Sequence, residues 1–333
     1  MRKINGSGNM SKAIKILSVA SYLPQTKVTN DDLSKIMDTS DEWIVSHTGI
    51  KNRYYAMNDE NTSDLATFVG AKLLEKANLD ASDIDLLIVS TISPDALTPS
   101  TAAIVEKKLG LTNAFAYDIS AACAGFIYAL STAEKFVNSD QYHRAMVISA
   151  EVNSKMMDFT DRTSTVFFGD GAAGVIIEKS DDKKSQYLAE KLETSGDEEV
   201  IHSGRMAPIQ AIEASNYPQM DAFFQQGRQV AEFVDTKVAN HMKKFLADND
   251  LNFDDIEYVI PHQANLRVIE KLAAKLGVSM DKVAKTVVDS GNISSVGIPL
   301  ALDKRLEEGS LEGKVLLTGF GAGLAIGSIL LEF

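Results

Sequence analysis

The chain has 333 residues, of which 45% are hydrophobic and 24% are charged, and its formal net charge is −13. This length is enough for one large core or for two fused ones. Such an acidic chain lacks the basic footprint of a nucleic-acid-binding protein, and its single cysteine excludes an internal disulfide. Its five histidines are scattered without a second cysteine nearby, so no zinc or iron–sulfur site is expected.

The N-terminal segment does not read as part of a folded unit. Residues 1–11 are expected to be a disordered leader or an expression remnant, with Met10 as the natural start. No apolar run in the chain reaches the roughly 18 residues that a membrane span needs. We therefore expect a cytoplasmic protein that binds neither membranes nor nucleic acid.

Short apolar runs alternate with longer helical patterns along the rest of the chain. The runs predict buried strands at 85–91, 144–150, 258–262 and 314–320, and apolar residues at helical spacing predict helices at 62–77, 100–110 and 264–277. This alternation predicts an α/β protein with mixed or parallel buried sheets. The polar stretch 178–199 predicts a surface connection between an N-terminal half, 12–180, and a C-terminal half, 181–333.

Three segments of the first half have counterparts in the second half, in the same order. The pairs are 166–178 with 317–332, 86–95 with 257–265, and 116–125 with 286–295. Their offsets are all roughly 150 to 170 residues, which indicates a duplicated α/β unit. Each member of the third pair predicts a strand, a polar turn and the start of a helix. Unrelated glycine-rich hairpins are the alternative reading.

The only cysteine, Cys123, lies between a predicted strand, 114–120, and a helical pattern that follows it. Cys123 is thereby placed in the first turn of a mostly buried helix. Unpaired N–H groups and the helix dipole favour a thiolate there, which suits a nucleophile. A buried structural cysteine fits the same position about equally well.

Two polar residues of the second half can serve such a nucleophile. His262 follows a predicted strand, where α/β sheets carry catalytic groups, and Asn292 lies in a polar Gly-Asn turn. Taken singly, each is explained by a structural role. The repeat alignment, however, makes the turn of Asn292 the counterpart of the turn of Cys123, with His262 beside them.

The motifs "AACAGF", "HQANLR" and "GNISS…IP", followed by "LLTGFGAGLAIGSILL", resemble β-ketoacyl-acyl carrier protein synthase III, a family of thiolase-fold condensing enzymes. "DEWIVSHTGI" and "TDRTSTVFFGDGAAG" match as well, and the likeness covers about 12–333. The resemblance implies duplicated βαβαβ-type halves in a layered α-β-α-β-α sandwich. It implies a homodimer that condenses an acyl-CoA primer with malonyl-acyl carrier protein, losing CO2, to initiate fatty-acid synthesis. No metal or organic cofactor is implied.

The resemblance also assigns roles to residues of the reaction centre. Cys123 would carry the acyl group, and His262 and Asn292 would hold the enolate formed from the malonyl group. The backbone amides of Cys123 and Ala322 would form the oxyanion hole. Thr98 and Phe320 would line the acyl pocket.

Binding of the two substrates is assigned to residues around this centre. Trp43, Arg162 and Asn265 would bind CoA or pantetheine, since an aromatic plane and a guanidinium suit adenine and phosphates. Carrier-protein docking is assigned to Gln263, Ala264, Asn265, Leu266, Arg267, Lys271 and Lys275. The spacing of Arg267, Lys271 and Lys275 makes one basic stripe, which is also what an ordinary solvated helix face shows.

Several positions depart from the family pattern. His47 stands where an arginine associated with CoA binding is usual, and Ala322 interrupts a glycine triplet. Ile293 and Val296 add bulk beside Asn292. Thr98 and Ala231 stand where the family usually has large apolar residues. We hypothesise a primer pocket unlike that of an acetyl-specific enzyme, a wider one being the simplest form. Two alternatives remain: a ketosynthase or acyltransferase of specialised metabolism with a non-acetyl primer, and an inactive acyl-carrier-binding relative.

Overall fold

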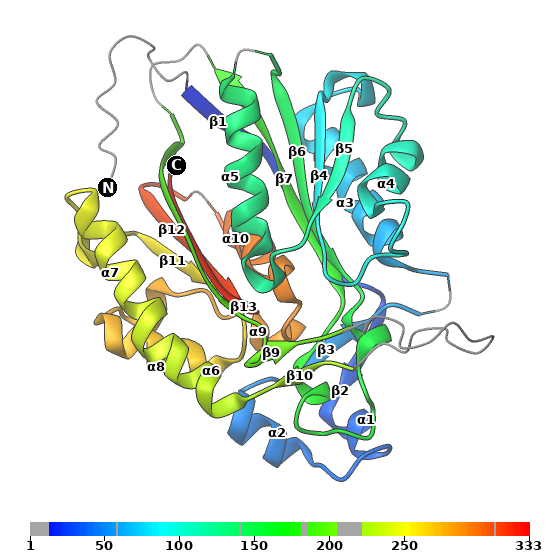
Figure 1. Cartoon of the computed structure of the whole chain (residues 1–333), viewed down its shortest axis with the longest axis vertical. Coiled ribbons are helices and arrows are strands. Elements are labelled where there is room, and N and C mark those ends of the chain that lie inside the picture. Colours follow the sequence, from blue (N-terminus) through cyan, green and yellow to red (C-terminus); the bar gives the residue numbers. More distant parts are fainter. Residues whose placement is uncertain (1–12, 58, 140, 181–184, 205–221, 310) are drawn as a thin grey trace, which may run out of the picture.

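The computed structural model describes residues 13–57, 59–139, 141–180, 185–204, 222–309 and 311–333. The expected leader, 1–11, lies outside these residues. The fold has five layers, in which two sheets enclose a pair of helices and further helices cover each sheet from outside (Figure 1). The layered α/β arrangement expected from the resemblance is therefore confirmed.

The first sheet has five strands in the order β1-β7-β6-β4-β5. Its strands are β1 (Ala13–Tyr22), β4 (Leu86–Ser90), β5 (Phe115–Ile119), β6 (Arg144–Glu151) and β7 (Gly171–Ser180). β4 lies parallel to both β5 and β6, whereas β7 is antiparallel to β1 and β6. Since β4, β5 and β6 are parallel, their carboxyl ends meet at one edge of the sheet, where ligands of such sheets are commonly bound.

The second sheet has four strands in the order β11-β12-β13-β8. They are β8 (Tyr187–Asp197), β11 (Tyr258–Pro261), β12 (Lys314–Gly321) and β13 (Gly323–Glu332). β11 and β12 are parallel, and β13 is antiparallel to both β12 and β8. Two small ribbons complete the strands: β2 (Thr26–Thr29) with β3 (Asn52–Tyr55), and β9 (Ile201–His202) with β10 (Phe224–Gln225).

Helices α5 (Gly125–Asn138) and α10 (Gly297–Glu307) form the middle layer. The outer helices are α3 (Thr62–Ala77) and α4 (Thr101–Leu109) on the first sheet, and α6 (Gly227–Phe233), α7 (Ala239–Asp248) and α8 (Leu266–Leu276) on the second. The shorter helices are α1 (Asn30–Ser34), α2 (Asp41–Thr48) and α9 (Val287–Ser290). One continuous core joins both sheets through the middle helices, with Leu86, Phe126, Ile298 and Leu317 among its buried members. The two halves are thus packed on each other rather than joined by a loose linker.

Most of the predicted elements are confirmed within one or two residues, but two predictions are wrong. The stretch 178–199 contains the edge strand β8 rather than only a surface connection, because an edge strand can expose most of its side chains. The segment expected to be a strand from residue 286 onward instead contains the short helix α9 (Val287–Ser290). The strands of the two sheets come from 13–180 and 187–332, but the division into two domains at 180 stays a prediction.

Candidate active site

Cys123 lies at the carboxyl edge of the first sheet, in a 3₁₀ turn (Ala122–Ala124) between β5 and α5. Gly125 begins α5, and a Cβ there would lie 2.0 Å from the Ser90 Oγ, so only glycine fits. Ala122 has a φ of 46°, in the left-handed region that costs a non-glycine residue energy. Cys123 therefore lies in the 3₁₀ turn that leads into α5, two residues before the first α-helical residue, rather than inside the first turn of the α-helix as predicted.

The end of strand β12 packs directly against Cys123. A Cβ on Gly321 would lie 2.9 Å from the Cys123 N and 3.0 Å from its Cβ, and a Cβ on Gly319 would lie 2.9 Å from the Ala124 Cα. Two glycines therefore let the β12 backbone approach the turn that contains Cys123. Ala322 follows at the β12–β13 turn, where the positive φ values belong to Gly323 (73°) and Leu324 (47°). Ala322 itself has no positive φ, so an alanine in place of the family's usual glycine costs no backbone strain here.

Ser294 connects the three residues expected to carry the chemistry. Its Oγ donates to the Cys123 Sγ over 3.5 Å, and its N–H donates to the Asn292 Oδ1 over 2.9 Å. Its backbone also interacts with the ring of His262. Sequence reasoning missed Ser294; the signal for it was its position in the turn that the repeat alignment pairs with the cysteine turn.

Asn292 is held from both sides by the first half of the chain. Its N–H donates to the Phe167 carbonyl over 2.8 Å, and its carbonyl accepts from the Gly169 N–H over 3.0 Å. A Cβ on Gly169 would lie 2.5 Å from the Ser290 carbonyl oxygen, so this contact also depends on glycine. The asparagine is therefore fixed between the halves rather than placed on a free loop.

His262 is buried, with 3% of its surface exposed, and its ring meets that of Phe320 edge-on at 5.2 Å between centroids. Burial lowers the pKa of His262 to about 3, and a hydrogen bond with the Ser294 backbone opposes this only weakly. The imidazole is consequently neutral at physiological pH. A neutral imidazole can donate a hydrogen bond from one ring nitrogen to a developing negative charge.

Cys123 is half-buried and forms no disulfide. Burial raises the pKa of Cys123 to about 11, the hydrogen bond from Ser294 lowers it, and the charge of Glu151 raises it further. The expected preference for thiolate is therefore wrong for the resting site, because desolvation outweighs the N-terminal end of α5. Deprotonation has to accompany attack on a substrate.

Backbone strain gathers around this site. Five non-glycine residues with positive φ occur in the described part of the chain, and two of them, Ala122 and Ser294, adjoin Cys123, while Leu324 follows the β12–β13 turn. The other two are Asn78 and Asp250, residue types that adopt this region readily. Strained residues of this kind persist where function over-determines the geometry, which favours this place as the reaction centre.

The residues expected to dock a carrier protein divide into buried and exposed ones. Gln263 is fully buried, and its amide bonds the Pro261 and Ala284 carbonyls and the Val287 N–H, so it cannot contact a docked partner. That expectation is wrong because the side chain ties β11 to the segment before α9. Asn265 is half-buried and caps α8, accepting from the Val268 N–H over 2.9 Å.

The basic stripe on α8 is also only partly free. Arg267 donates to the Val45 and Ser46 carbonyls and pairs with Glu270 at 3.0 Å, so it ties α8 to the end of α2. Leu266 packs against Gly49, the residue after α2, in the same contact between the two helices. Ala264 is half-buried. Lys271 and Lys275 are exposed and remain as the accessible basic groups of the stripe.

Trp43, His47 and Arg162 form one cluster beside this contact. The His47 ring stacks on the indole of Trp43 at 4.4 Å, and the Arg162 guanidinium lies 5.2 Å from the same ring. The His47 Nδ1–H donates to the Trp43 carbonyl over 2.7 Å, and Arg162 binds the backbone and side chain of Asp38. The histidine that departs from the family pattern is therefore in contact with the aromatic ring expected to stack on a nucleotide.

The other departures lie in different surroundings. Thr98 is exposed, on the segment between β4 and α4, whereas Phe320 is buried beside His262. Ile293 and Val296 are fully buried and pack with Ala173 and Leu300. Ala231 is exposed on α6.

Two further observations concern the described ranges. No helix there is long and apolar enough to cross a membrane. No group of three or more His, Cys, Asp or Glu side chains there is arranged as a metal site requires.

Comparisons with known proteins agree with this geometry. The profile of 3-oxoacyl-[acyl-carrier-protein (ACP)] synthase III matches residues 117–196, and that of its C-terminal part matches 246–333. The beta-ketoacyl-[acyl-carrier-protein] synthase III 1 of Lactiplantibacillus plantarum is 55% identical over 319 residues, covering 96% of this chain and 98% of the relative.

Solved structures extend the comparison to three dimensions. The 3-oxoacyl-[acyl-carrier-protein] synthase III of Aquifex aeolicus superposes with a TM-score of 0.87 at 37% identity, over 96% of this chain and 100% of the other. The priming beta-ketosynthase of the R1128 polyketide pathway gives 0.89 at 31% identity, over 99% and 98%. The chain therefore belongs to the 3-oxoacyl-[acyl-carrier-protein] synthase III family, the condensing acyltransferases that initiate fatty-acid synthesis.

Proposed function

We propose that Cys123 takes the acyl group of an acyl-CoA primer and keeps it as a thioester. The sulfur attacks the primer's carbonyl carbon, the carbon–sulfur bond to CoA breaks, and the thiol proton leaves with the CoA thiol. The Cys123 and Ala322 amides would bind the oxyanion of the tetrahedral intermediate. The close approach of Gly321 to Cys123 supports this, since it brings the β12–β13 turn to the nucleophile.

In the second half-reaction, malonyl-acyl carrier protein would replace CoA and lose CO2. Breaking the bond to the carboxylate leaves an enolate on the malonyl thioester, which His262 and Asn292 would hold by donated hydrogen bonds. The enolate carbon then attacks the acyl-cysteine, and Cys123 departs as the 3-ketoacyl carrier protein forms. The neutral state of His262 supports this role because a neutral ring donates without adding a charge to the buried site.

One observation carries this assignment: Ser294 touches Cys123 and Asn292 and interacts with His262, so residues from both halves share one small volume. An inactive acyl-carrier-binding relative would have no need to keep this arrangement together with the two strained residues, Ala122 and Ser294, beside the thiol.

Intact-protein mass spectrometry tests the proposal. Incubation with acetyl-CoA, isobutyryl-CoA and longer acyl-CoAs is expected to add one acyl mass to the wild type and none to Cys123→Ala. His262→Ala is expected to acquire the acyl group but to form no ketoacyl product from malonyl carrier protein. An acyl adduct on Cys123→Ala, or normal condensation by His262→Ala, would contradict the assigned roles.

We also propose that the preferred primer is larger than acetyl. The exposed Thr98 and Ala231 and the stacking of His47 on Trp43 are this chain's own features and support a changed primer site. Acylation rates across a series of acyl-CoAs decide the matter: strict preference for acetyl-CoA rules the idea out.

The acyl carrier protein is expected to dock on α8 through Lys271 and Lys275, the exposed basic residues of that helix. Reversing both charges to glutamate should raise the KM for malonyl carrier protein by about tenfold, because rim charges steer an acidic partner. Lys243→Glu on the exposed face of α7 is the matched control and should leave that KM unchanged.

A homodimer is expected through the free edge of β5. This strand ends its sheet, and Phe115 lies 37% exposed in an aromatic cluster with Tyr117, Phe136 and Tyr142. An unpaired edge with apolar side chains is a template for pairing with a second copy. Light scattering should report a dimer for the wild type and a monomer for Phe115→Lys; a monomeric wild type contradicts the expectation.

The cytoplasm is the expected location, since a nucleophilic thiol has to stay reduced and a reducing compartment keeps it so. Cell fractionation with an antibody to the chain checks this. The proposed steps use side chains, backbone amides and the two thioester substrates, and they call for no metal or organic cofactor.

A further inference from the structure

A buried carboxylate, that of Glu151, lies near Cys123 and has no part in the proposed steps. Glu151 ends β6 and is fully buried. Its oxygens accept from the Thr91 Oγ1 (3.1 Å), the Ile92 N–H (3.1 Å), the Ser93 N–H (3.1 Å) and the Ser93 Oγ (2.5 Å). The Glu151 carboxylate thus accepts hydrogen bonds from three consecutive residues that follow β4.

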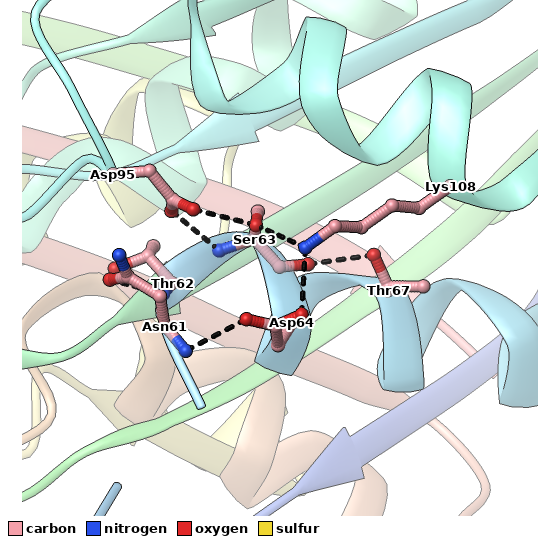
Figure 2. Close-up of polar contacts among 7 residues, drawn as sticks. All are labelled: Asn61, Thr62, Ser63, Asp64, Thr67, Asp95 and Lys108. Carbon is pink, nitrogen blue, oxygen red and sulfur yellow. Dashed lines mark hydrogen bonds and ion pairs between the residues drawn. The ribbon is translucent and has the colours of Figure 1, made fainter. Parts of the chain in front are cut away.

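The same segment is tied down again a few residues later. The Thr62 Oγ1 donates to the Ser93 carbonyl. Asp95 accepts from the Ser63 N–H (2.8 Å) and Oγ (2.7 Å) at the start of α3 (Figure 2). Lys108 of α4 donates to the Ser63 Oγ and to Asp64. These contacts fix residues 93–95 to α3, which leaves the carboxylate of Glu151 as the anchor for residues 91–93 beside the site.

The anchored segment is connected to the thiol through hydroxyl groups. Ser90, the last residue of β4, donates from its Oγ to the Ser295 Oγ over 3.3 Å. Ser295 follows Ser294, whose hydroxyl donates to the Cys123 Sγ. Thr91 also pairs with the strand before the cysteine turn, since its N–H donates to the Ile119 carbonyl over 3.2 Å. Moving Thr91 would therefore disturb both turns that contain reacting groups.

We propose that Glu151 is a positioning residue for acyl transfer at Cys123: its carboxylate holds Thr91–Ser93, and through Ser90 and Ser295 this holds the Ser294 hydroxyl against the thiol. The proposal rests on the function proposed above. Glu151 touches no reacting atom itself. Its second effect is electrostatic, because a negative charge close to the thiol disfavours the thiolate.

The charge of Glu151 acts on two nearby titratable groups, the Cys123 thiol and the ammonium group of Lys155, which follows β6. Asp95 and Asp170 also act on Lys155, whose ammonium group donates to Asn61, Thr62 and the Pro94 carbonyl. Burial raises the pKa of Glu151 to about 7, while the hydrogen bonds from Ser93, Ile92 and Thr91 lower it.

Two readouts on Glu151→Gln test the proposal: the rate of Cys123 acylation by acyl-CoA, and the pH profile of Cys123 alkylation by iodoacetamide, both by intact mass. The amide has one acceptor oxygen in place of two, so acylation should slow by about ten- to a hundredfold through misplacement of the segment. The alkylation profile should move to lower pH because a negative charge near the thiol is gone. A purely structural glutamate would not move this profile.

Ser93→Ala and Glu134→Gln are the companion variants. Ser93→Ala removes the shortest hydrogen bond and keeps the charge, so acylation should slow while the alkylation profile stays in place. Glu134, a buried carboxylate on α5 bonded to Lys135 and Asn138, is the matched control and should leave both readouts unchanged.

An unshifted alkylation profile together with wild-type acylation in Glu151→Gln would overturn the proposal. If that variant does not fold, wild-type acylation by Ser93→Ala would overturn it instead. A wild type that alkylates but never acylates would refute the proposed function, while the alkylation profiles would still decide whether Glu151 acts on the thiol.

Discussion

Replacing Gly321 with alanine isolates the contact between β12 and the nucleophile. The new Cβ would lie 2.9 Å from the Cys123 N and 3.0 Å from the Cys123 Cβ. Carbon atoms in contact are about 3.5–4.0 Å apart, so the two backbones must separate by roughly half an ångström. Gly321 has no positive φ, which means that alanine adds this crowding without backbone strain.

A shift of this size is enough to disturb the proposed oxyanion hole. Reacting groups have to hold their positions within about 0.5 Å, and a misplacement of about 1 Å can cost about a hundredfold in rate. Acylation of Cys123 by acyl-CoA, followed by intact mass in single-turnover conditions, should therefore slow by about ten- to a hundredfold. Overpacking should also lower the free energy of unfolding by about 1–3 kcal/mol.

Gly323→Ala is the control from the same turn. Gly323 has a φ of 73° and no atom within 4 Å of the position of a new Cβ, so alanine there adds strain without crowding. The strain should cost about 1–2 kcal/mol of stability and leave acylation within a few-fold of the wild type. If Gly321→Ala acylates at the wild-type rate, or if both variants lose activity in proportion to stability, the β12–β13 turn does not serve the nucleophile.

Alkylation of Cys123 by iodoacetamide should speed up by about tenfold per pH unit from pH 7 to 10, because only the thiolate reacts and burial raises the thiol pKa to about 11. A plateau near pH 7 would show that the resting thiol is already ionised. Gly49→Ala should cost more stability than Gly277→Ala in urea unfolding, by about 1–3 kcal/mol. Both glycines have a φ near 73°, but only at Gly49 would a new Cβ meet Leu266, at 2.5 Å; equal losses would show that α2 does not pack closely on α8. Treatment with EDTA should leave condensation unchanged, and loss of activity restored by a divalent metal would contradict the proposed steps.

Much of the fold follows from local apolar patterns in the sequence. The run at 85–91 is β4 and the helical spacing at 62–77 is α3, because buried strands and amphipathic helices differ in period. β8 was not predicted, since an edge strand with one exposed face carries charged residues that read as a connection. Local polarity therefore misleads at the edge of a sheet, where burial is partial.

The residues of the candidate site were predictable from the sequence, but their burial and the ionisation state of the thiol were not. The motifs located Cys123, His262 and Asn292, yet whether the thiol is ionised depends on burial by residues that are distant in sequence. Gln263 matched a docking pattern because the pattern contains no information on burial, and the structure encloses it. Ser294 went unnoticed because a serine in a polar turn is ordinary until its neighbours in space are known.

The turn that contains Cys123 has a counterpart of the same geometry in the second half, although that counterpart carries no cysteine. Ala122 and Ser294 have nearly the same positive φ, 46° and 49°, each opens a 3₁₀ turn, and each is followed three residues later by the glycine that starts α5 or α10. The two turns contact each other through the Ser294 hydroxyl and the Cys123 thiol. In this alignment the counterpart of Cys123 is Ser295, which is buried and bonded to Ser90. One copy of the turn thus carries the thiol, and the other contacts it through a hydroxyl group.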